Sequence, residues 1–213
     1  MLQRVSFPVA GTEVVGILHL PDRGTVGGVI EMGSGDIDDG AYVCDALAAS
    51  GIAALRFTFR VRPAGGRTID PLAGLADAAA AVRLLRAHPA VPQRIGVVGH
   101  SFGGVVAALT AGRDSRIRAA ALLATPAERP ELGKLRPPAE LSRTRARVLL
   151  VSAGSDERVP PADAERYASV LRQAGVVHRV VAIEDADHLF SVPEHRRQML
   201  ESLTGWMRSA LEG

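Results

Sequence analysis

The chain has 213 residues, of which 47% are hydrophobic and 23% charged, and its formal net charge at pH 7 is +2. This length and apolar content suffice for one sizeable core but are short for two, which predicts a single domain over residues 1–213. The small net charge argues against a nucleic-acid partner.

Several features of the chain favour a cytoplasmic protein. No apolar run approaches the roughly 20 residues of a membrane span. The first residues show no basic segment followed by an apolar one, so we expect neither a cleaved secretory signal nor a membrane anchor. The single cysteine, Cys44, can form no internal disulfide, which fits a reducing compartment.

Strand and helix patterns alternate along the chain after an opening hairpin, which joins residues 4–9 to 14–20. The further predicted strands are 28–32, 52–57, 95–98, 117–123, 148–152 and 179–183. The predicted helices are 38–50, 72–87, one beginning near residue 103, 162–173 and 194–211. This alternation predicts an α/β fold with a mostly parallel, doubly wound, eight-stranded sheet flanked by helices. Its functional edge should be the carboxyl end of the strands.

The pentapeptide Gly99-His100-Ser101-Phe102-Gly103 joins a predicted strand to a predicted helix. At such a sharp turn the serine backbone is strained and the residues two positions to either side come close together, which glycine permits. The helix N-terminus then directs NH groups toward negative charge that develops beside the serine. Ser101 is therefore the candidate nucleophile, although three fixed positions also arise by chance in glycine-rich chains.

A serine nucleophile needs a base, and the base needs an acid that orients it. Asp156 follows the apolar strand 148–152, and His188 follows the strand 179–183. Both positions lie past the carboxyl ends of parallel strands, so we expect them at the same edge of the sheet as Ser101. The chain order Ser, Asp, His is the order of the α/β-hydrolases.

The rival acids are Glu157, Asp185 and Asp187. We prefer Asp156 because the strand before it ends four residues earlier. A hydrolase also needs donors for an oxyanion, and we expect one at the NH of Phe102 and a second in the loop after the strand 28–32.

The chain resembles the α/β-hydrolase superfamily, in particular small lidless serine hydrolases of the dienelactone-hydrolase-like type. The most specific segments are 99–104, 154–160 and 187–190, with a weaker one at 55–60. The resemblance runs from the strand that ends at Met32 to the last helix. Two departures stand out: Met32-Gly33 replaces a common His-Gly pair, and Ser101 stands where some dienelactone hydrolases have cysteine. The second departure argues against dienelactone itself as the substrate.

The resemblance implies an α/β-hydrolase fold and cleavage of small carboxylic esters, thioesters or lactones through an acyl-serine, with no cofactor and no metal. It also favours the NH of Ser34 as the second oxyanion donor, with Gly35 as the alternative. Larger relatives insert a cap after the sixth strand, but here only residues 124–146 separate it from the seventh. We therefore expect no cap domain and a fairly open site for a small-molecule ester.

Two other functions stay open. One is a peptidase or acyltransferase with the same three residues, and the other is a binding scaffold without catalysis, since a fold does not determine a function. The sequence contains no feature that decides the oligomeric state.

Some further residues have two interpretations. Gly35, Arg60 and Arg62 are candidates for substrate contacts, although we prefer a structural ion pair for Arg60 and solvent exposure for Arg62. Asp36, Asp38 and Asp39 could suggest a cation site, but we expect them to cap the helix that begins there and to stabilise it by their charge. His100 lies inside the pentapeptide and is expected to point beneath it. No pair of histidines shows metal-ligand spacing.

Overall fold

The computed structural model describes residues 1–33, 37–38, 40–60 and 70–213. Its core is a sheet of eight strands, in the spatial order β1-β2-β4-β3-β5-β6-β7-β8 within the described residues. The strands are β1 (Leu2–Val9), β2 (Thr12–His19), β3 (Gly28–Met32), β4 (Ala53–Phe57), β5 (Ile95–His100), β6 (Ile117–Leu123), β7 (Arg147–Ala153) and β8 (His178–Ile183).

The first two strands are the antiparallel part of the sheet. β1 pairs with β2 and β2 pairs with β4 in antiparallel register, whereas all pairs from β4 to β8 are parallel. The parallel strands β3 and β4 are buried at every position. Helices cover both faces of such strands, so their residues are mostly apolar; the exceptions here are Glu31 and Arg56.

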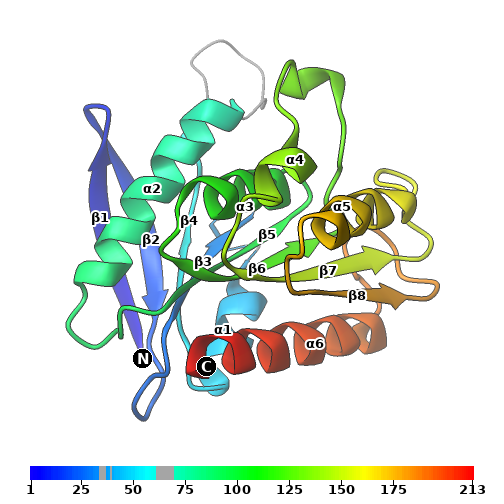
Figure 1. Ribbon diagram of the computed structural model, residues 1–213. Coiled ribbons are helices and arrows are strands. Elements are labelled where there is room, and N and C mark those ends of the chain that lie inside the picture. The colour runs from blue at the N-terminus through cyan, green and yellow to red at the C-terminus, as the bar shows by residue number, and fades with distance from the viewer. Residues whose placement is uncertain (34–36, 39, 61–69) are drawn as a thin grey trace.

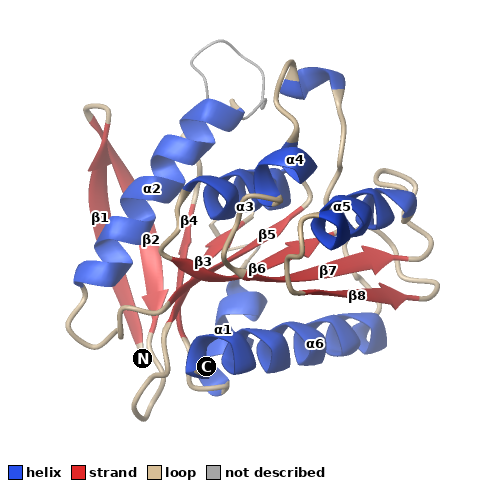
Figure 2. Ribbon diagram, viewed as in Figure 1, coloured by secondary structure: helices blue, strands red, loops and turns tan. Residues whose placement is uncertain are grey.

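Two layers of helices cover the sheet (Figures 1 and 2). The helices α2, α3, α4 and α5 lie on one face, and α1 and α6 lie on the other. Their bounds are α1 (Ala41–Ala49), α2 (Pro71–Ala87), α3 (Phe102–Arg113), α4 (Pro137–Leu141), α5 (Ala162–Gln173) and α6 (Pro193–Glu212). This is the α/β-hydrolase architecture that the sequence predicts.

The connection between β6 and β7 contains two short elements that the sequence patterns do not predict. They are a 3₁₀ helix η1 (Pro130–Leu132) and α4, each of which begins at a proline. Proline suits the first position of a helix because its missing NH would have no partner there. Segments this short show no measurable periodicity in a sequence. No cap domain is built on this connection.

The helix expected from residue 38 begins instead at Ala41, and its N-cap is Gly40, which makes no side-chain cap. The expectation of a cap is therefore wrong for Asp38, whereas Asp36 and Asp39 lie outside the described residues. Asp38 instead lies 2.8 Å from the guanidinium of Arg56. A buried arginine needs an anionic partner, and that demand outweighs the preference of aspartate for a helix N-cap.

Across the described residues, no helix combines the length and the apolar character that crossing a membrane requires.

Candidate active site

Ser101 occupies the turn between β5 and α3 with a strained backbone. Its φ of 54° and ψ of −120° lie where residues with a side chain are rarely found. Its NH donates to the carbonyl of Leu123 on the neighbouring strand β6 at 2.9 Å. The sheet therefore holds Ser101 at the carboxyl edge, in the sharp turn that the pentapeptide predicts.

Two glycines make this turn possible. A Cβ on Gly99 would lie 2.2 Å from the carbonyl oxygen of Gly103, so the two positions that flank the serine are in contact. A Cβ on Gly103 would lie 1.6 Å from the carbonyl oxygen of Met32, at the end of β3. Because Gly103 has no side chain, the start of α3 packs directly against the strand that leads into the expected oxyanion loop.

The structure brings Ser101, His188 and Asp156 into one continuous chain of contacts. The Nε2 of His188 lies 3.0 Å from the Oγ of Ser101, and its Nδ1 lies 2.6 Å from Oδ2 of Asp156. The side chain of Asp156 is fully buried and that of His188 is 8% exposed. A carboxylate accepts hydrogen bonds only, so the proton of neutral His188 belongs on Nδ1, and Nε2 presents its lone pair to the serine hydroxyl.

Asp156 is itself held by the backbone of its loop. Its second carboxylate oxygen, Oδ1, accepts from the NH groups of Arg158 and Val159, both at 2.8 Å. Both oxygens of the buried carboxylate therefore have donors, which offsets the cost of taking the charge out of water. The same bonds set the direction in which Oδ2 faces His188.

The rival acid Asp187 has a different role in the structure. Its Oδ1 accepts from the NH groups of Leu189 and Ser191, at 3.1 and 2.8 Å, and its Oδ2 bonds the hydroxyl of Ser191. The hydrogen bonds from Ser191 lower the pKa of Asp187. Asp187 thus closes the turn that follows His188, and the contact to the imidazole belongs to Asp156.

A cavity of about 420 Å³ contains the serine and the histidine. Three charged side chains border it together with polar and apolar ones. The lining residues are Glu31, Gly33, Gly40, Tyr42, Val43, His100, Ser101, Leu123, Arg158, His188, Leu189 and Arg196.

Of the two expected oxyanion donors, the structure describes Phe102 but not Ser34. Phe102 is the first residue of α3, and the first NH groups of a helix have no carbonyl partner four residues earlier. Its NH is therefore available beside Ser101. Ser34 and Gly35 lie outside the described residues, whereas Gly33, which precedes them, lines the cavity.

Of the three candidate substrate contacts, the structure describes only Arg60. Arg60 bonds to Asp77, which is fully buried, through its guanidinium Nε at 2.5 Å and its backbone NH at 3.0 Å. It also donates to the carbonyl of Val9 at 3.2 Å. The structure therefore places Arg60 in a structural ion pair, the interpretation preferred above, and not among the cavity residues, so the alternative of a substrate contact is not supported. Arg62 lies outside the described residues.

Sequence reasoning missed several residues that line the cavity. Glu31 interrupts an otherwise apolar strand and is 5% exposed, and this interruption is a signal that the sequence does contain. Tyr42 and Arg196 come from α1 and α6, and the guanidinium carbon of Arg196 lies 4.8 Å from the ring centre of Tyr42. No local pattern links these two residues, because only the packing of the two helices brings them together.

His100 was expected to point beneath the turn. Instead it lines the cavity, and its Nε2 lies 2.7 Å from the carbonyl oxygen of His188.

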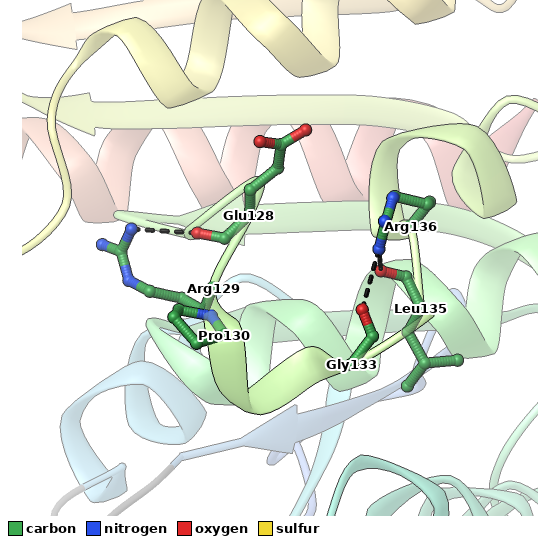
Figure 3. A pocket seen from close by; sticks show the side chains of 6 residues that line it. All are labelled: Glu128, Arg129, Pro130, Gly133, Leu135 and Arg136. Carbon is green, nitrogen blue, oxygen red and sulfur yellow. Dashed lines mark hydrogen bonds between the residues drawn. The ribbon is translucent and has the colours of Figure 1, made fainter.

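A second cavity, of about 310 Å³, lies in the connection between β6 and β7 (Figure 3). Its two arginines donate to carbonyls of their own loop: Arg129 to Glu128 at 3.0 Å, and Arg136 to Gly133 and Leu135 at 2.9 and 3.0 Å. These guanidinium groups stabilise the loop. The lining residues include none of the three residues in contact around His188.

Within the part of the chain that the structure describes, no three His, Cys, Asp or Glu side chains gather closely enough to hold a metal ion.

Comparisons with known proteins agree with this fold. A dienelactone hydrolase from Anabaena variabilis shares 23% identity, with 99% of this chain and 98% of that one covered and a TM-score of 0.81. Est1E from Butyrivibrio proteoclasticus shares 17% identity, with 99% of both chains covered and a TM-score of 0.84. An esterase domain from Rhodothermus marinus shares 22%, again with 99% of both covered, at a TM-score of 0.78. At these identities the likeness shows the fold.

The model of the dienelactone hydrolase family matches residues 66–208, which is more than half of the chain. The protein belongs to this family and is an enzyme with hydrolase activity. A comparison with curated protein sequences found no match.

Proposed function

We propose that the protein cleaves small carboxylic esters, or thioesters or lactones, through an acyl-serine intermediate. In this proposal Ser101 is the nucleophile, His188 the general base and Asp156 the acid that orients it. The observation that carries the proposal is the unbroken contact from the Ser101 hydroxyl through His188 to Asp156, at 3.0 and 2.6 Å, beside a cavity.

The chemistry follows from these contacts. The Nε2 of His188 takes the hydroxyl proton as the Ser101 oxygen attacks the carbonyl carbon, and Asp156 stabilises the imidazolium that forms. The NH groups of Phe102 and Ser34 would bind the oxyanion. His188 then gives the proton to the leaving alcohol, which leaves an acyl-serine. Water, activated by the same histidine, attacks this ester and frees the acid and Ser101.

The size and borders of the cavity favour small substrates. Its volume of about 420 Å³ lies at the lower end of ordinary ligand sites. Among the described residues no cap domain covers it, so long acyl chains would gain little buried contact. Esterase activity is also named for one of the structural neighbours, the domain from Rhodothermus marinus. We infer a small-molecule ester rather than a nucleic acid or a membrane lipid as the natural partner.

We also infer that residues 1–213 form one domain that works in the cytoplasm. One sheet joins the strands from β1 to β8, and Cys44 is a buried free thiol. Fractionation of cells that produce the protein would test the compartment.

The deciding experiment is active-site labelling with a fluorophosphonate probe, combined with a chain-length series of p-nitrophenyl esters. We expect labelling of Ser101, loss of both labelling and hydrolysis in Ser101→Ala, and the highest rates with short acyl chains. Ser155→Ala is the matched control, because Ser155 is exposed in the loop before Asp156 and should leave both signals unchanged.

Hydrolysis at the wild-type rate by Ser101→Ala, or labelling at another residue, would refute the assignment. A panel of ester, thioester and amide substrates, with and without an acyl acceptor, separates the ester hydrolase from a peptidase or acyltransferase that uses the same residues.

A further inference from the structure

The residue before the proposed nucleophile contacts the main chain of the proposed base. His100 ends β5, and its Nε2 lies 2.7 Å from the carbonyl oxygen of His188, 88 residues further along the chain. The two imidazole rings also touch, with centroids 4.8 Å apart and planes tilted by 48°. The rings of His100 and Phe190 are arranged edge-on, with centroids 6.3 Å apart.

The chemistry of this contact determines where the proton of His100 lies. A carbonyl oxygen only accepts, so Nε2 of His100 must carry a hydrogen and donate it. Burial lowers the pKa of His100 to about 4, although the hydrogen bond to the carbonyl of His188 opposes this shift. The ring is therefore neutral at pH 7, in the tautomer with the proton on Nε2.

The loop that carries His188 needs such an anchor. Asp185 and Phe190, on either side of the histidine, both have positive φ values of 56° and 49° although neither is glycine. Left-handed backbone at such residues is strained and persists only where neighbouring contacts hold it. The Asp187 side chain bonds the turn after the histidine, and the NH of Ser155 bonds the carbonyl of Ala186 before it. The hydrogen bond from His100 holds the main chain of His188 itself.

We propose that His100 is a positioning residue: its imidazole NH holds the main chain of His188, so that the base stays aligned with the neighbouring Ser101. The nucleophile and the base are then linked twice, once through Oγ and Nε2 and once through the side chain of the residue adjacent to the nucleophile. This inference rests on the proposed roles of Ser101 and His188.

The neutral state of His100 suits this position. During the proposed reaction His188 becomes an imidazolium, and a second charged ring 4.8 Å away would oppose that step by like-charge repulsion. A neutral imidazole supplies the anchoring NH without this cost. Lysine or arginine in the same place would supply a donor together with a permanent charge.

Two variants separate the hydrogen bond from the bulk of the ring. His100→Phe keeps a ring but removes the hydrogen-bond donor. We expect kcat for a short p-nitrophenyl ester to fall about 10- to 100-fold while KM changes little, because even a small misplacement of the His188 imidazole slows the reaction. His100→Gln carries an amide NH₂ at a similar reach and should recover kcat to within about fivefold of the wild type.

The matched control is His178→Phe. His178 also bonds a main-chain carbonyl, that of Val176 at 2.8 Å, but it lies at the start of β8 and does not line the cavity. Its kcat should equal that of the wild type. Equal loss of activity in His100→Phe and His100→Gln, or wild-type kcat in His100→Phe, would overturn the inference.

A spectroscopic measurement on the wild-type protein needs no stable variant at this position. Long-range ¹H–¹⁵N spectra of the imidazole groups distinguish the two neutral tautomers, and we expect the Nε2–H form for His100 at pH 7. An Nδ1–H form could not donate to His188 and would refute the inference. The Ser101→Ala variant distinguishes failure of the two proposals. If Ser101→Ala remains active, the proposed function is wrong. If Ser101→Ala is inactive but His100→Phe is fully active, only the role of His100 is rejected.

Discussion

In the part of the chain that the structure describes, two histidines bond to aspartates, and the two pairs differ in their surroundings. In the first, Nδ1 of His188 lies 2.6 Å from an aspartate, Asp156, whose side chain is fully buried. In the second, Nδ1 of His19 lies 2.9 Å from Asp45, whose side chain is 68% exposed. Both histidines are buried and both bond a carboxylate through the same nitrogen. A hydrogen bond between histidine and aspartate is therefore not enough to distinguish a catalytic pair from a structural one.

The partner of the other ring nitrogen makes the difference. The Nε2 of His188 faces the hydroxyl of Ser101 at 3.0 Å beside the cavity. The Nε2 of His19 accepts a hydrogen bond from the guanidinium of Arg56 at 2.9 Å. A lone pair that already accepts from a permanent cation cannot take a proton from a substrate or nucleophile. The comparison predicts a catalytic pair and a structural pair, and four experiments test it.

The largest effect should come from the two aspartates. Asp156→Asn should lower kcat for a short p-nitrophenyl ester by about 10⁴-fold, because an amide favours the wrong tautomer of His188. Asp45→Asn should change kcat by less than about twofold, since exposed pairs contribute little. Steady-state kinetics of both variants, with circular dichroism to show folding, make the measurement. Similar losses in the two variants would abolish the distinction.

The second effect is on stability. His19→Phe leaves Nε of the buried Arg56 without its acceptor, and we expect the free energy of unfolding to fall by about 1–3 kcal/mol. Urea unfolding curves of the variant and the wild type provide the value. Hydrolysis by the folded variant should continue, because His19 does not line the cavity. Loss of hydrolysis as complete as in Ser101→Ala would contradict the structural assignment.

The third effect is a pH dependence of stability. Burial lowers the pKa of His19 below 6.5, partly offset by Asp45. Below about pH 6.5 the unfolded chain therefore binds a proton that the folded protein resists, and stability falls as the pH falls toward the folded pKa. His19→Gln removes this contribution, so its unfolding free energy should depend less steeply on pH between about 7 and 5. Parallel curves for the variant and the wild type would show that His19 does not contribute.

The smallest effect concerns the rival acid. Asp187 bonds the backbone of its own turn and not the imidazole, so Asp187→Asn should lower kcat by less than about tenfold. The same ester assay used for Asp156→Asn measures it. A loss greater than that of Asp156→Asn would transfer the role of the orienting acid to Asp187.

Much of the site was predictable because its parts are local in the chain. The pentapeptide at 99–103 predicts a strained turn, and Ser101 has that conformation, since the close approach of Gly99 and Gly103 depends on five consecutive residues. The apolar runs also predict strand ends at residues 152 and 183. In the structure the first strand ends one residue later, at Ala153, and the second ends at Ile183. The parallel sheet then brings their loops to one edge.

Other parts depend on packing between distant segments. Tyr42 and Arg196 meet because α1 and α6 cover the same face of the sheet, and neither residue belongs to a recognisable motif. The ion pair of Arg60 with Asp77 depends on how α2 packs beside the end of β4. A side chain that lies in a loop by sequence can face either the cavity or the core, and only its neighbours in space decide which.

The sequence by itself determined the alternation of strands and helices, the turn at Ser101 and the edge of the sheet where a site would form, because hydrophobic periodicity and glycine spacing act over short stretches of chain. The tertiary structure decided which carboxylate meets His188, why the pair of His19 and Asp45 is structural, and that His100 reaches the main chain of His188. These contacts join residues between 26 and 88 positions apart, and their geometry exists only once the sheet and its two helix layers have packed together.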